Sequence, residues 1–138
     1  MQHFIIWCKS ISKYLLFGWM LTILILSSIP NIPTLKIHTA RHEFRLDYLM
    51  HFAEYGMLSF LAFIYFAENE FRIGYRKVIL IASGIVLFAV LDELHQKLIP
   101  GRTFSTMDIM SDVTGVAAAI VFTIFLFRSV ARKLKKAS

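Results

Sequence analysis

The sequence is poor in charge and in cysteine, and each shortage excludes a class of protein. Charged residues make up 17% of the 138 residues, whereas soluble domains average about 25%. The single cysteine, Cys8, excludes an intramolecular disulfide and cannot form a zinc site alone. The segments between the long apolar stretches are all shorter than 20 residues, so no soluble catalytic domain fits between them.

Apolar residues are abundant instead. They account for 57% of the chain, with 13 phenylalanines and a mean hydropathy of +0.64. A soluble domain of this length leaves much of its area in water and cannot hide that much apolar surface. The composition therefore indicates an integral membrane protein.

Four apolar segments are each long enough to cross a bilayer as a helix, at about 1.5 Å per residue against a hydrocarbon core of about 30 Å. Lipid offers no partner for backbone N–H and C=O groups, so spans of this length should be helical. We predict an all-α bundle of four transmembrane helices in a single domain, residues 1–138. The predicted helices cover residues 11–29, 48–67, 78–99 and 108–127, followed by a basic tail, 128–138.

The first span has an alternative interpretation. Lys9 and Lys13 before an apolar stretch resemble a secretory signal peptide. The apolar run is longer than the usual apolar core of a signal peptide, however, and Pro30 follows it without a clean cleavage pattern of small residues.

Lysine and arginine predict the orientation of the helices, because they accumulate on the cytoplasmic side. The amino-terminal segment, the second connection and the tail carry ten of them, and the first and third connections carry five. Both termini are therefore expected in the cytoplasm, with the first and third connections outside. The net charge of +6 is then explained by basic residues that set the orientation and bind anionic lipid head groups, and we expect no nucleic-acid partner.

Polar residues interrupt three of the four spans, each time near one end. The second span opens with Asp47, His51 and Glu54, which share a helical face through i, i+4, i+7 spacing. The third span ends, and the fourth begins, with further polar residues. The predicted ligand-binding residues are Asp47, His51, Glu54, Tyr55, Asp92, Glu93, His95, Gln96, Arg102, Asp108 and Asp112.

Because successive helices alternate in direction, these three polar ends should meet on one side of the membrane, predicted to be the outer one. The simplest interpretation is that the polar groups bond to one another and fix the register of the helices. Carboxylates nevertheless outnumber cationic groups in the set, and close carboxylates repel unless a cation joins them. A bound metal, a proton or a cationic group of a ligand would supply that charge.

Two chemistries fit these residue types. Carboxylates with a histidine suit zinc, manganese or magnesium, and the candidate metal ligands are His51, Glu54, Asp92, Glu93 and Asp112. Arg102, with the backbone amides at the start of the fourth helix, suits phosphate, and its alternative is a solvated arginine paired with Asp108. No cofactor other than a divalent metal is indicated.

Several short motifs occur together in this chain. They are Ser28-Ile29-Pro30, Asp47 with His51-Phe52-Ala53-Glu54-Tyr55, Asp92-Glu93-Leu94-His95-Gln96, Pro100-Gly101-Arg102, and Asp108 with Asp112 and Gly115. With these motifs the chain resembles the VanZ-like family of bacterial membrane proteins over residues 14–127. It departs from the family pattern at Tyr48-Leu49, where a basic residue is usual, and at Asp112, where the family has asparagine.

The resemblance implies a multi-pass protein of the bacterial cytoplasmic membrane, in a family named for a member linked to resistance to the lipoglycopeptide teicoplanin. We therefore expect a cell-envelope protein that binds a polar or lipid-linked ligand, such as a lipid-linked cell-wall precursor or a lipoglycopeptide. The alternative is a metal-dependent enzyme, a hydrolase or transferase acting on a lipid-linked phosphate. An ion or proton pathway is a third hypothesis, which the apolar cytoplasmic halves of the spans do not favour.

Overall fold

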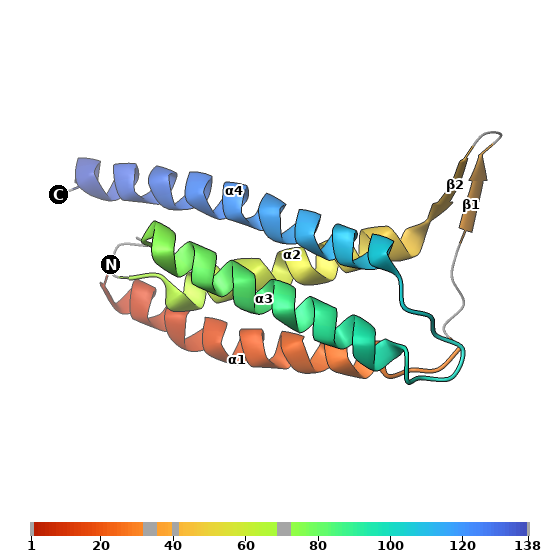
Figure 1. Ribbon diagram of the computed structural model, residues 1–138. Coiled ribbons are helices and arrows are strands. Elements are labelled where there is room, and N and C mark those ends of the chain that lie inside the picture. The colour runs from red at the N-terminus through yellow and green to blue at the C-terminus, as the bar shows by residue number, and fades with distance from the viewer. Residues whose placement is uncertain (1, 32–35, 40–41, 69–72, 138) are drawn as a thin grey trace.

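The computed structural model describes residues 2–31, 36–39, 42–68 and 73–137. This part of the chain forms helices α1 (Gln2–Ser27), α2 (Leu46–Phe66), α3 (Tyr75–Gln96) and α4 (Thr106–Ala137) (Figure 1). All four are long and apolar enough to cross a membrane. The predicted four-helix class is confirmed.

A short hairpin between α1 and α2 adds to the predicted architecture. Strands β1 (Lys36–Thr39) and β2 (His42–Arg45) pair antiparallel, with Lys36 opposite Arg45. In a strand of only four residues the alternation of apolar and polar side chains is too short to be recognised, so the sequence did not predict this hairpin. Arg41 and Arg72, two of the charges used to predict the orientation, and Ser138 at the end of the predicted tail lie outside the described residues.

Two helices continue beyond their predicted ends. α1 begins at Gln2, before the predicted start at residue 11, and α4 continues through the basic segment to Ala137. Lysine and arginine are good helix formers, so charge ends a membrane span without ending a helix. At about 1.5 Å per residue, the 32 residues of α4 exceed the thickness of the hydrocarbon core.

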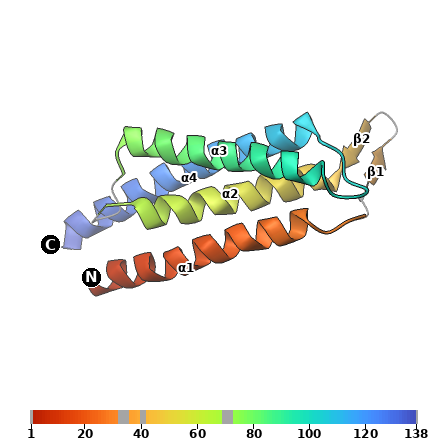
Figure 2. The same ribbon diagram turned by 60° about the horizontal axis from the view of Figure 1, so that its bottom comes forward.

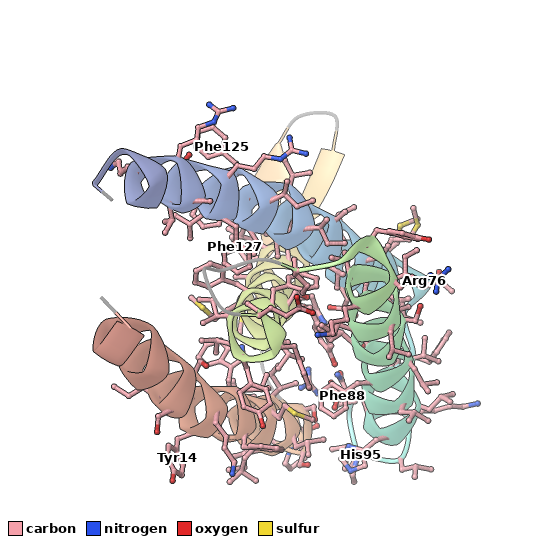
Figure 3. All side chains as sticks on the ribbon, turned by 90° about the vertical axis from the view of Figure 1, so that its left-hand side faces the viewer. Tyr14, Arg76, Phe88, His95, Phe125 and Phe127 are labelled. Carbon is pink, nitrogen blue, oxygen red and sulfur yellow. The ribbon has the colours of Figure 1, made fainter. Side chains whose placement is uncertain are left out.

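α2 lies in the middle of the bundle, with α1, α3 and α4 around it (Figure 3). Its buried residues Tyr55, Leu58 and Ala62 form one apolar core with Ile23 of α1 and Ala89 of α3, among others. The outward faces carry large apolar side chains instead; Leu80 is 73% and Phe125 71% exposed. Such extensive apolar exposure is the arrangement expected where lipid is the solvent.

Helices α2 and α4 approach each other closely at two glycines. A Cβ atom added to Gly115 would collide with the carbonyl oxygen of Phe52, and one added to Gly56 would contact the backbone of Gly115. Small residues let membrane helices approach closely. We call this contact, made by Phe52, Gly56 and Gly115, the glycine contact, and it lies one turn from His51 and Asp112.

Candidate functional site

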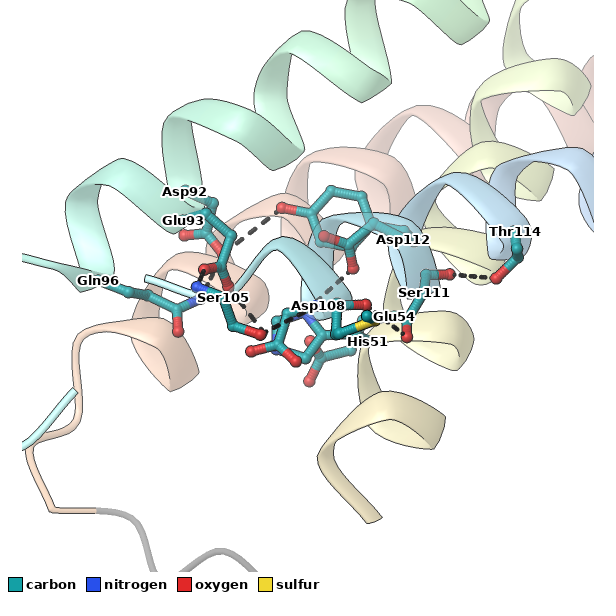
Figure 4. Close-up of polar contacts among 12 residues, drawn as sticks. His51, Glu54, Asp92, Glu93, Gln96, Ser105, Asp108, Ser111, Asp112 and Thr114 are labelled. Carbon is teal, nitrogen blue, oxygen red and sulfur yellow. Dashed lines mark hydrogen bonds and ion pairs between the residues drawn. The ribbon is translucent and has the colours of Figure 1, made fainter. Parts of the chain in front are cut away.

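Polar side chains of α2, α3 and α4 gather at the end of the bundle opposite the two termini (Figures 2 and 4). The start of α2, the end of α3 and the start of α4 meet there, as the alternation of helix direction predicts. The buried polar residues that these three helices place at this end are His51, Asp92, Glu93, Gln96, Asp108 and Asp112, and α1 adds Ser27. Glu93 and Asp112 are each only 1% exposed.

The imidazole ring of His51 lies between carboxylates of α3 and α4. Its Nδ1 is 3.0 Å from Oδ1 of Asp112, a hydrogen-bond distance. Its Nε2 faces Oε1 of Glu93 at 4.0 Å and Oδ2 of Asp108 at 3.9 Å. A neutral His51 that donates its Nδ1–H to Asp112 therefore presents the lone pair of Nε2 to two further carboxylates. We call His51, Glu93, Asp108 and Asp112 the histidine group.

The start of α4 positions two of these carboxylates. The hydroxyl oxygen of Ser105 accepts the backbone N–H of Asp108 (3.3 Å), as an N-cap residue does. The backbone N–H of Ser105 is donated to Oε2 of Glu93 (3.0 Å). In a capping box the acidic residue of the same helix turn accepts that N–H. Here Glu93 of α3 replaces it, and the Asp108 carboxylate is directed toward His51 instead.

A second group of polar side chains consists of Asp92, Tyr55 and Gln96, and we call it the Asp92 group. Oδ2 of Asp92 accepts the hydroxyl of Tyr55 (3.4 Å) and the side-chain amide of Gln96 (3.1 Å). The bond from Tyr55 joins α2 to α3 at the depth of the histidine group, and the bond from Gln96 lies within α3.

Arg102 connects this end of the bundle to α1. Its Nη2 donates to the carbonyl oxygen of Leu26 (3.1 Å), one of the carbonyls that the end of a helix leaves without a partner in the helix. The preceding Gly101 has a φ of 80°, and a Cβ there would collide with the side chain of Asn31. The turn before Arg102 thus requires glycine and brings the guanidinium over the end of α1.

A small pocket lies between these groups. Its volume is ≈ 50 Å³, and the residues that line it are Leu26, Ser27, Asp47, Met50, His51, Glu54, Asp92, Gln96 and Arg102. A water needs about 10–15 Å³ by this kind of measure, so the pocket has room for a few water-sized groups. A whole glycopeptide would not fit in this volume.

Several buried polar atoms at this end have no hydrogen-bond partner among the described residues. They are Oδ1 of Asp92, Oε1 of Glu93, Nδ1 of His95, Nε of Arg102, Oδ1 of Asp108 and Oδ2 of Asp112. Buried polar groups without partners are rare in native proteins, and each one calls for an explanation. Unpartnered polar atoms from α3, α4 and the connection between them are thus concentrated at this end of the bundle.

The structure brings ten of the eleven predicted residues to the histidine group, the Asp92 group or the pocket. The exception is His95, which is half-buried at the end of α3 (Figure 3) and does not line the pocket. Sequence reasoning missed Ser105, although Ser105 with Asp108 has the spacing of a capping pattern. It also missed Leu26 and Ser27 of α1, for which no local signal exists.

One set of atoms in the described region could hold a metal ion. Ligand atoms of His51, Glu93 and Asp108 lie within 4.8 Å of one another. Of the predicted metal ligands, this set contains His51 and Glu93. Asp112 binds the other nitrogen of the ring, whereas Glu54 and Asp92 line the pocket.

Comparison with known proteins gives the family. A family model described as VanZ/LLP1 matches residues 4–128, which include α2, α3, most of α1 and α4, and every residue of the site. No curated protein and no solved structure matches the chain. The match confirms the resemblance found in the sequence motifs: the chain belongs to the VanZ/LLP1 family of membrane proteins.

Proposed function

We propose that this protein binds the polar head group of a lipid-linked ligand, in a pocket that opens at the outer face of the bacterial cytoplasmic membrane. The observation that carries the proposal is the pocket between α1, α2, α3 and Arg102, lined by charged and polar groups at the end of an otherwise apolar bundle. Ionisable residues within membrane spans are costly, and they usually mark a functional site.

The lining of the pocket indicates the chemistry of the ligand. Arg102 offers a planar guanidinium that suits phosphate oxygens, and its Nε has no partner among the described residues. Asp47, Glu54 and Asp92 accept hydrogen bonds and repel a bare anion. A ligand with both a phosphate and sugar hydroxyls meets both demands, as the head group of a lipid-linked cell-wall precursor does.

The outward orientation rests on the count of lysine and arginine, and cysteine labelling tests it. Leu98, in the connection between α3 and α4, is 79% exposed. In a Cys8→Ser background, Leu98→Cys is expected to react with a membrane-impermeant maleimide added outside intact cells. Reaction at this position only after the cells are opened would place the pocket on the cytoplasmic face and contradict the proposal.

Binding can be measured by native mass spectrometry of the protein in nanodiscs. We expect a polyprenyl-phosphate sugar to bind at least about tenfold more tightly than polyprenyl phosphate, because only the sugar supplies donors for the carboxylates. Arg102→Ala should weaken binding of the sugar by about tenfold or more, since a hydrogen bond to a charged group contributes about 1.5–3 kcal/mol. Asp92→Ala should weaken it as well.

Lys97→Ala is the matched control, because Lys97 is an exposed cation of the same connection that does not line the pocket. Equal binding by wild type and Arg102→Ala would overturn the assignment of the pocket. In cells, expression of the wild type is expected to raise the inhibitory concentration of teicoplanin. Asp92→Ala, Glu93→Ala and Arg102→Ala should abolish that gain while the protein remains inserted.

The alternative, a metal-dependent enzyme acting on a lipid-linked phosphate, draws on one observation. Nε2 of His51 faces two carboxylates beside the pocket, and a divalent ion there would polarise a phosphoryl oxygen or activate a water. Release of inorganic phosphate or of the sugar when the same nanodiscs are given Mn²⁺ would favour the enzyme. Intact ligand after long incubation would favour a binding protein.

A further inference from the structure

We propose that His51, Glu93 and Asp108 form a centre for one divalent cation, and that Asp112 is the positioning residue for His51. Nε2 of His51 and one carboxylate oxygen from each of the other two would be the ligands. This inference stands apart from the lipid-linked ligand proposed above, because it concerns the histidine group alone.

The geometry is the first argument. Nε2 of His51 lies 3.9 Å from Asp108 and 4.0 Å from Glu93, and the three ligand atoms fall within 4.8 Å of one another. Ligands at about 2.0–2.2 Å from a tetrahedral ion are about 3.3–3.6 Å apart. Small rotations of the two carboxylates would close that difference without a movement of the helices.

The second argument is an unpartnered atom directed at the centre. Oε1 of Glu93 has no hydrogen-bond partner among the described residues, and Glu93 is 1% exposed. A buried acceptor without a partner is destabilising, and more so when it is charged. A cation between Nε2 of His51 and this oxygen would remove that cost.

The third argument is that the ligands are already oriented by further contacts. Metal-binding histidines almost always donate their other ring N–H to a carboxylate or a carbonyl, and Nδ1 of His51 lies 3.0 Å from Asp112. The second oxygen of Glu93 accepts the backbone N–H of Ser105 at 3.0 Å. Two of the three ligands therefore have the supporting bonds typical of metal sites.

Charge balance favours a metal over a protonated His51. A proton on Nε2 could form a straight hydrogen bond to only one of the two facing carboxylates, which lie at 3.9 and 4.0 Å. One imidazolium would also leave three carboxylates under-compensated at a depth where charge is costly. A divalent cation instead neutralises Glu93 and Asp108 while His51 stays neutral.

The ligand types indicate which cations fit. Calcium and magnesium prefer oxygen ligands, whereas one imidazole with two carboxylates suits manganese or zinc. We expect Zn²⁺ to displace Mn²⁺, following the general order of affinity for first-row metals.

Pulsed EPR on untagged protein in nanodiscs, stripped with a chelator and loaded with Mn²⁺, tests the centre directly. We expect one Mn²⁺ per chain and a nitrogen coupling from a coordinated imidazole. His51→Gln should lose the coupling, while His95→Gln, which removes the other histidine of α2–α4, should keep it. Glu93→Gln and Asp108→Asn should each weaken binding by about tenfold or more.

Asp112→Asn distinguishes a positioning residue from a ligand. It is expected to weaken Mn²⁺ binding by about 10–100-fold, the usual effect of losing such a support, with the nitrogen coupling retained. Glu54→Gln, which alters a carboxylate of the pocket, is the control and should bind Mn²⁺ like wild type. Absence of imidazole coupling in the folded wild-type protein, which requires no variant, would overturn the proposal, as would coupling that persists in His51→Gln. No polyprenyl-linked ligand is added to these samples, so a failure to bind Mn²⁺ is separate from a failure of the proposed function.

Discussion

Replacing Gly115 by alanine is expected to lower the free energy of unfolding by about 2 kcal/mol, within the range of overpacking substitutions. The added methyl group would collide with the carbonyl oxygen of Phe52. That atom belongs to the backbone of α2, so it cannot rotate away as a side chain would. α2 and α4 would have to separate. Reversible unfolding in mixed detergent micelles, followed by circular dichroism, measures the effect.

Gly84→Ala is the matched control for this substitution. Gly84 also lies within a membrane-spanning helix, but a Cβ there meets nothing within 4 Å. In a helix interior, alanine is more stable than glycine by roughly 0.5–1 kcal/mol, so Gly84→Ala should be neutral or slightly stabilising. Equal losses of stability in the two variants would show that the glycine contact is not what holds α2 against α4.

His51→Leu is expected to destabilise the metal-free protein by about 3 kcal/mol, because removal of one partner of a buried pair leaves the other uncompensated. The adjacent Asp112 would lose its partner at 3.0 Å while remaining 1% exposed. The double variant His51→Leu/Asp112→Leu should cost less than the sum of the two single variants. The cycle is measured by the same unfolding assay with a chelator present.

The interaction energy from this cycle should be at least about 1 kcal/mol, as for residues in direct contact. Removing Asp112 as well will recover only part of the stability lost in His51→Leu, because Glu93 and Asp108 still face the position of the lost ring. His95→Leu combined with Asp112→Leu is the control, and these two changes should be additive. Additivity in the His51–Asp112 cycle would mean that their contact contributes no stability.

The meeting of three polar helix ends could be predicted from the sequence because it follows from the alternation of helix direction alone. The rotation of α3 was harder to predict, since His95 and Gln96 are equally close to Asp92 along the helix. The buried residues of α3 include Ile85, Ala89, Asp92 and Gln96, a stripe with spacings of four, three and four. Residues 78–91 of α3 are apolar on every face of the helix, so this stripe cannot be recognised in the sequence and the structure was needed to exclude His95.

The roles of Asp108 and Asp112 could not be separated by spacing. Both lie on one face of α4, and the sequence analysis placed Asp112 among the metal ligands. Which ring nitrogen each carboxylate faces depends on how closely α2 and α4 approach, and the glycine contact determines this. The bond between Arg102 and Leu26 joins residues 76 positions apart, and no pattern in the sequence predicts such a pairing.

That bond also has a consequence for the order in which the protein is made. Leu26 leaves the ribosome 76 residues before Arg102, which corresponds to about 4–15 s of synthesis at about 5–20 residues per second. During that interval the carboxyl end of α1 is made first and the imidazole of His51 follows 25 residues later, both before Arg102. The pocket is therefore completed only when the last hairpin of helices is inserted, and a chain truncated before residue 102 would span the membrane without it.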